Sequence, residues 1–124
     1  MQARLRTIAM VIGAIFAIQG LGWLVLPEMA AGMLGMPPLE GMARSTQFGD
    51  FAAFFLFVGT TIFLGCRPGH GRILYFPAAL LATAAFGRII AWAFHDAVFA
   101  TAFVIVEVIC AAVLLMTAQN TDAS

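Results

Sequence analysis

The sequence predicts an all-α integral membrane protein, folded as an antiparallel, up-down bundle of four helices. The 124 residues are 63% hydrophobic and only 10% charged, whereas about a quarter of the residues in a soluble domain are charged. The mean hydropathy is +1.02, and the apolar residues form four runs separated by polar breaks. These runs predict a single transmembrane domain over residues 1–124.

The first helix is predicted over residues 7–26 and the second over residues 48–66. The first run carries no formal charge, and at about 1.5 Å per residue it crosses a hydrocarbon core of roughly 30 Å. The second run is uncharged only after Asp50 and covers about 24 Å, which falls short of the core. We therefore expect Asp50 at the membrane interface.

The third and fourth helices are predicted over residues 73–94 and 97–117. Each apolar run contains one ionisable residue, Arg88 or Glu107. A helix that ended at either charge would be too short to span, so both charges are expected inside the membrane. Short polar breaks between these helices, with almost no slack at 95–97, predict that consecutive helices pack antiparallel.

The connection between the first two helices contains a short apolar segment, residues 29–36, which ends at two prolines. Such a segment lies in the interface or enters the membrane and returns. Four methionines in and after it could form an adaptable binding surface, although gap-filling is the commoner role of methionine. These are Met29, Met33, Met36 and Met42.

Small residues recur at helical spacing on the first and third helices. Small side chains let helix backbones approach closely where lipid removes the hydrophobic force between helices. We therefore expect both stripes to be packing surfaces. The first comprises Ala9, Gly13, Ala17 and Gly20, and the second Ala78, Ala82 and Ala85.

Arginine marks one side of the membrane. Arg4 and Arg6 precede the first helix, and Arg67 and Arg72 flank the second loop. By the positive-inside rule both termini are expected on the cytoplasmic side of a bacterial inner membrane. The formal net charge is zero and lysine is absent, so the expected partner is the lipid bilayer and not nucleic acid.

In this orientation a buried polar cluster, comprising Gln19, Asp50, Arg88 and Glu107, gathers in the outer half of the bundle. An isolated charge near mid-bilayer costs about 2.5 to 3.5 kcal/mol, so we expect Arg88 to pair with Glu107, across a depth offset of about 5 Å. Arg88 could instead reach Asp50 or Asp96, and Glu107 could be protonated. Possible peripheral members of the cluster are Arg44, His95 and Asp96.

The cluster has two interpretations. A buried pair can simply fix which helix faces meet, which is the favoured interpretation, or the cluster can line an outward-opening pocket for a lipid head group, a quinone or a proton. His70 and His95 lie on opposite sides of the membrane and there is no C-x-x-C motif. We therefore expect no metal site, no evident cofactor beyond a lipid or quinone, and no identifiable catalytic set.

Single polar residues in order along the chain resemble a family of small bacterial four-helix membrane proteins of unknown function, which is similar to the DoxX-like group. The resemblance implies the four-helix architecture. It also implies a setting near membrane redox assemblies, quinol chemistry or assembly roles, as for DoxX-like proteins. This chain has Asp50 and Ala97 where that family usually has glycine. The residues that carry the resemblance are Leu26-Pro27-Glu28, Arg44, Gly49-Asp50, Phe86-Gly87-Arg88, Asp96 and Glu107.

Small size and the lack of a catalytic set predict a non-catalytic accessory or assembly subunit of a membrane complex, whose partner is another membrane protein or a second copy. The alternative is a lipid- or quinone-binding protein or enzyme, with its pocket in the outer half of the bundle. Enzymatic activity is the less expected outcome. An open cavity lined by the polar cluster would favour the alternative, and a closed, fully paired core the accessory subunit.

Overall fold

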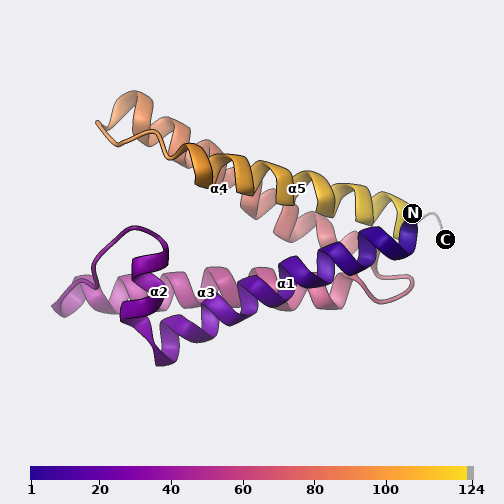
Figure 1. Cartoon of the computed structure of the whole chain (residues 1–124), viewed down its shortest axis with the longest axis horizontal. Coiled ribbons are helices and arrows are strands. Elements are labelled where there is room, and N and C mark those ends of the chain that lie inside the picture. Colours follow the sequence, from indigo (N-terminus) through magenta and orange to yellow (C-terminus); the bar gives the residue numbers. More distant parts are fainter. Residues whose placement is uncertain (123–124) are drawn as a thin grey trace.

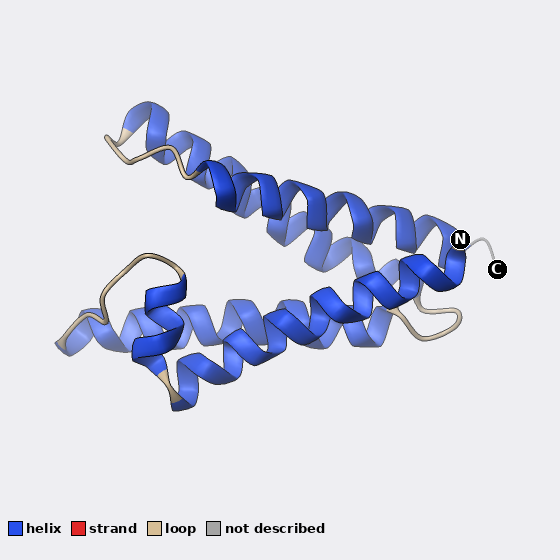
Figure 2. Ribbon diagram, in the orientation of Figure 1, coloured by secondary structure: helices blue, strands red, loops and turns tan. Residues whose placement is uncertain are grey.

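The computed structural model describes residues 1–122, with side chains to Asn120, and this part of the chain is helical without strands (Figure 2). Four segments are long and apolar enough to cross a membrane, which confirms the predicted multi-pass helical bundle. The elements are α1 (Gln2–Val25), α2 (Pro27–Met33), α3 (Gly41–Gly65), the 3-10 turn η1 (Gly71–Leu74), α4 (Tyr75–Phe94) and α5 (Thr101–Asp122).

Helix α3 begins at Gly41, well before the predicted start at residue 48, and has 25 residues. Its first turns are fixed by Gln47, whose side chain is buried. The Gln47 Oε1 accepts from the backbone N–H of Leu39 at 2.8 Å, and its Nε2 donates to the carbonyl of Pro37 at 3.1 Å. The helix that carries the second apolar run is therefore longer at its start than the predicted 48–66. Helix α1 is also longer than predicted and begins at Gln2.

Helix α5 begins at Thr101 and not at residue 97, so the connection after α4 is longer than the expected tight turn. Asp96 adopts a φ of 58°, and the backbone N–H of Ala97 donates to the carbonyl of Ala91 at 3.2 Å. Many helices end at a residue in the left-handed conformation that is followed by a backbone N–H donating to a carbonyl near the end of the helix. Because the chain then needs a few extended residues to turn, the next helix starts late.

The long helices form two antiparallel pairs, α1 with α3 and α4 with α5. The pairs lie together at the end that carries both termini and diverge toward the other end (Figure 1). Between α1 and α3 the backbones nearly touch, since a Cβ on Gly59 would lie 2.8 Å from the Ala17 nitrogen. Gly13 and Gly20 meet Ile62 and Leu56 of α3 as closely. The packing role predicted for the first small-residue stripe is confirmed.

The stripe on α4 is only partly confirmed. Ala78 and Ala85 are buried, but Ala82 is exposed, and Leu81 is buried in its place. The buried positions of α4 are therefore 78, 81 and 85. With these positions facing the neighbouring helices, Ala82 points away from them. A core cluster of buried residues joins the two pairs and includes Ala9, Val58, Ile62, Leu74, Ala78, Leu81, Ala111, Leu114 and Ala118.

The segment after α1 folds back along α1 as the short helix α2. Ala30 and Ala31 are buried there against Trp23, and Gln19 Nε2 donates to the carbonyl of Ala30 at 2.9 Å. A Cβ on Gly22 would lie 3.5 Å from the Cβ of Ala30, so α2 packs on the last turns of α1. Whether this segment lies in the interface or re-enters the membrane stays open.

The methionines of this region do not form one surface. Met36 accepts a hydrogen bond at its sulfur from Gln47 Nε2 at 3.0 Å, within the loop. Met42 is exposed in the first turn of α3, while Met29 and Met33 line a small hollow between α1 and α2. Only Met33 also reaches the cleft described next.

A cleft between the two helix pairs

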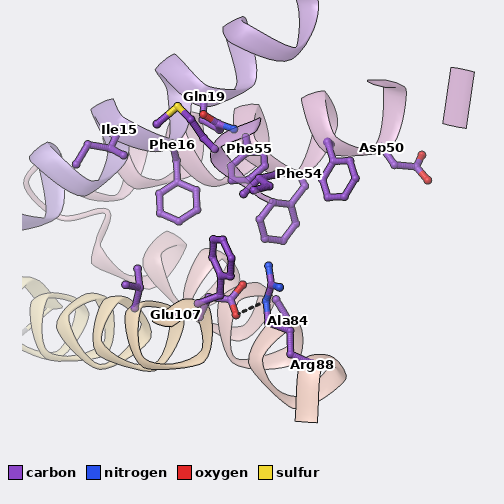
Figure 3. A pocket seen from close by; sticks show the side chains of 14 residues that line it. Ile15, Phe16, Gln19, Asp50, Phe54, Phe55, Ala84, Arg88 and Glu107 are labelled. Carbon is purple, nitrogen blue, oxygen red and sulfur yellow. Dashed lines mark hydrogen bonds and ion pairs between the residues drawn. The ribbon is translucent and has the colours of Figure 1, made fainter. Parts of the chain in front are cut away.

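The four residues of the predicted polar cluster all line one cleft between the α1/α3 pair and the α4/α5 pair (Figure 3). Its volume is about 420 Å³. Every helix contributes to the walls, so the cleft exists because the pairs diverge. The lining residues are Ile15, Phe16, Gln19, Met33, Leu34, Asp50, Phe51, Phe54, Phe55, Ala84, Arg88, Phe103, Val106 and Glu107.

Arg88 and Glu107 form the expected ion pair, with 2.9 Å between Arg88 Nε and Glu107 Oε1. Arg88 lies six residues before the last residue of α4, Phe94, and Glu107 lies six residues after the first residue of α5, Thr101. The predicted depth offset of about 5 Å is therefore absent. It arose from the assumption that α5 starts at residue 97.

The pair leaves part of the guanidinium unused. Its Nε is the nitrogen that binds Glu107, and the terminal nitrogens make no hydrogen bond to the residues that the structure describes. The Arg88 side chain is 34% exposed, against 10% for Glu107. Its Cζ lies 4.6 Å from the centroid of the Phe103 ring, which is a cation–π contact. In Figure 3 the group points across the cleft toward Phe54.

Gln19 faces the cleft from the opposite wall (Figure 3). Because a carbonyl can only accept, the hydrogen bond to Ala30 identifies the amide nitrogen as the atom that faces α2. The amide oxygen is then the free acceptor of Gln19, since no partner for it occurs within residues 1–122. The two walls thus carry a donor, Arg88, and an acceptor.

Asp50 lies at the mouth of the cleft and not beside the ion pair. Its side chain is exposed and points away from Arg88 and Glu107 (Figure 3). The neighbouring Phe51 stacks on Trp23, with ring centroids 4.9 Å apart, so Asp50 is level with the C-terminal end of α1. The partner of Arg88 in this structure is Glu107 and not Asp50, and the position of Asp50 at the membrane interface stays a prediction.

The three peripheral candidates do not line the cleft. Arg44 donates from Nε to the carbonyl of Leu39 and lies over the ring of Phe48 at 5.7 Å, so it supports the loop before α3. His95 is exposed at the C-terminal end of α4. Asp96, with its positive φ, belongs to the same helix end.

Aromatic residues form much of the cleft wall, and the sequence interpretation missed them. Phe51, Phe54 and Phe55 recur at positions i, i+3 and i+4 of α3, a spacing that places them on one helix face. This spacing was the signal that could have identified them. Phe16 and Phe103 complete the set from α1 and α5.

The rim of the cleft is apolar and exposed on the side away from Asp50. Ile15, Met33 and Val106 are 60%, 68% and 52% exposed. Exposed apolar rims on membrane-spanning helices face acyl chains and not water. In a membrane this rim would therefore face the lipid.

Comparison with protein-family models, with characterised proteins and with solved structures gives no match to this chain. The resemblance to the DoxX-like group stays a prediction. Functional inference therefore depends on the geometry of the cleft.

Proposed function

We propose that this chain is a membrane-embedded binding protein for an amphipathic molecule of the bilayer, a lipid or a quinone. The observation that carries the proposal is that Gln19, Asp50, Arg88 and Glu107 line one open cleft. A cluster that served only to fix helix faces would be closed and fully paired. Here the donors of Arg88 remain turned toward open space.

The composition of the cleft supports binding of such a molecule. Ligand sites are typically concave and mostly apolar, with volumes of about 300–1,000 Å³ and a few convergent polar groups. This cleft has about 420 Å³, five phenylalanine rings and one ion pair at its depth. An acyl or prenyl chain would lie against the rings while the head group meets Arg88.

We also propose the orientation of the chain in a bacterial inner membrane. Arg4 and Arg6 begin the chain at the end where the helix pairs meet, and Arg67 and Arg72 lie in the α3–α4 connection at the same end (Figure 1). The positive-inside rule favours this end as cytoplasmic. The cleft would then open to the outer leaflet.

The test is purification in mild detergent followed by mass spectrometry of the extracted small molecules. Ala84 lines the cleft, so Ala84→Trp fills the cleft without altering a polar group. Ala82→Trp is the matched control, because Ala82 lies on the same helix and is exposed outside the cleft. We expect the amphiphile to co-purify with the wild type and the Ala82 variant and to be lost from the Ala84 variant.

Equal retention of every small molecule by the two variants would overturn the proposal. Recovery of a stoichiometric protein partner, with no amphiphile that depends on Ala84, would instead support the accessory or assembly subunit.

A further inference from the structure

The charges around the cleft restrict which head group it can take. Arg88 and Glu107 cancel one another at 2.9 Å, and Asp50 adds a carboxylate at the mouth. Titratable side chains of the described lining are limited to these three. An anionic head group that entered at the mouth would pass the Asp50 carboxylate, and at Arg88 it would lie within a few ångström of the Glu107 carboxylate, which repels it more strongly at the low dielectric of a protein interior than in water.

The hydrogen-bonding groups on the walls fit an uncharged carbonyl. The free N–H groups of Arg88 can donate to it, while Nε stays on Glu107. The Glu107 carboxylate and the Phe103 ring both contact the guanidinium, and these two contacts restrict its position before a ligand arrives. Gln19 keeps its amide nitrogen on the Ala30 carbonyl, so Arg88 is the donor of the lining that remains available to a carbonyl.

The aromatic wall fits a flat ring. Phe54 and Phe55 meet edge to face at 84°, with centroids 5.1 Å apart, and Phe51 and Phe55 lie 6.4 Å apart at 26°. Arranged in this way, the rings offer both faces and edges. A planar head group can stack on a face or meet an edge, whereas a tetrahedral phosphate has no aromatic surface to offer.

Given the proposed binding function, we infer that the cleft selects an uncharged, planar, carbonyl-bearing head group, that of a prenylated quinone, and rejects anionic phospholipids. Arg88 is the donor to the quinone carbonyl, and Asp50 contributes to rejection of anions at the mouth.

The experiment uses the full chain in phosphatidylcholine nanodiscs, with a short-chain ubiquinone as the probe and phosphatidylglycerol as the competitor. We expect saturable quinone retention that phosphatidylglycerol does not displace. Arg88→Lys keeps the charge opposite Glu107, but its one nitrogen is held at the carboxylate, and it lacks the separate terminal nitrogens that the guanidinium extends into the cleft. It should weaken quinone retention about tenfold, the effect of losing one hydrogen bond from a charged donor.

A second variant tests the rejection of anions independently of the ion pair. Asp50 is exposed, so Asp50→Asn should fold normally. It should shift the ratio of the two affinities several-fold toward phosphatidylglycerol. Asp96→Asn removes the same charge outside the cleft, from a left-handed position that asparagine tolerates, and should leave the ratio unchanged.

The outcomes separate this inference from the proposed function. Displacement of quinone by phosphatidylglycerol at equal concentration, or undiminished quinone retention in Arg88→Lys, overturns the inference. If phosphatidylglycerol is itself retained and is lost in Ala84→Trp, the binding function stands with an anionic ligand. If neither molecule is retained in a way that depends on Ala84, both proposals fail together.

Discussion

The contact between α1 and α3 can be tested with one added methyl group. In Gly59→Ala the new Cβ would lie 2.8 Å from both the nitrogen and the Cβ of Ala17. Ordinary carbon contacts are about 3.5 to 4.0 Å, so the two helices must separate by about 0.7 Å. Because the obstruction includes backbone atoms, no side-chain rotation relieves it.

The expected effect combines two opposing contributions. Replacing glycine by alanine inside a helix stabilises it by about 1 kcal/mol, while overpacking a close interface costs about 1–3 kcal/mol. Gly59→Ala should therefore lower the free energy of unfolding by up to about 2 kcal/mol. Gly49 lies on the same helix with no atom near its missing Cβ, so Gly49→Ala should raise it by about 1 kcal/mol.

The two cysteines provide the assay. Cys66 and Cys110 are both buried, and burial raises the pKa of the Cys66 thiol, against a smaller opposing influence of Arg6. A thiol-reactive fluorogenic dye should therefore label the protein only on unfolding. At about 4 °C per kcal/mol, the midpoints of the two variants should differ by roughly 4–12 °C.

An equal rise of the midpoint in both variants would refute the close approach at Gly59. A fall in both would show instead that the outer turns of α3 pack against something at Gly49. A variant with both cysteines replaced by serine must give no signal.

Two further predictions concern the polar residues of α4 and α5. In a double-mutant cycle of Arg88→Gln and Glu107→Gln, we expect a coupling energy of about 1–2 kcal/mol in unfolding measurements. The charge-assisted bond at 2.9 Å favours coupling, and exposure of the arginine to the cleft weakens it. Zero coupling would show that the pair does not form. Asp96→Gly should raise the unfolding midpoint by about 4 °C, because glycine adopts a φ of 58° without the roughly 1 kcal/mol penalty of a side chain. A lower midpoint would show that the Asp96 carboxylate makes a stabilising contact.

The four spans and the Arg88–Glu107 pair were predictable from the sequence because each follows from one strong energy term. Apolar runs must be long enough to cross lipid, and two opposite charges inside them must meet. The start of α3 was not predictable in this way. Its first turns depend on contacts of Gln47 with a loop eight to ten residues earlier, which hydropathy does not encode.

The divergence of the helix pairs was also outside what the sequence revealed. The small residues of the first stripe, such as Ala17, predict that this helix meets another closely, but not that two helix pairs separate farther along. The residues of the polar cluster were therefore identified from the sequence. The favoured interpretation, a closed cluster that fixes helix faces, could not be tested at that point, because hydropathy does not show whether the helix pairs enclose an open cleft. The ring spacing on α3 was the available signal for a shared aromatic wall.

The position of the ion pair within the fold determines whether a molecule could enter the cleft without breaking the pair. Arg88 and Glu107 join α4 to α5 inside one helix pair, and they do not join the two pairs across the cleft. A molecule can therefore enter between the pairs without breaking the salt bridge, whose loss would leave a charge unpaired in the membrane. In the proposed function, the polar groups that would meet the ligand are already held in place by this pair, and binding would not require them to separate.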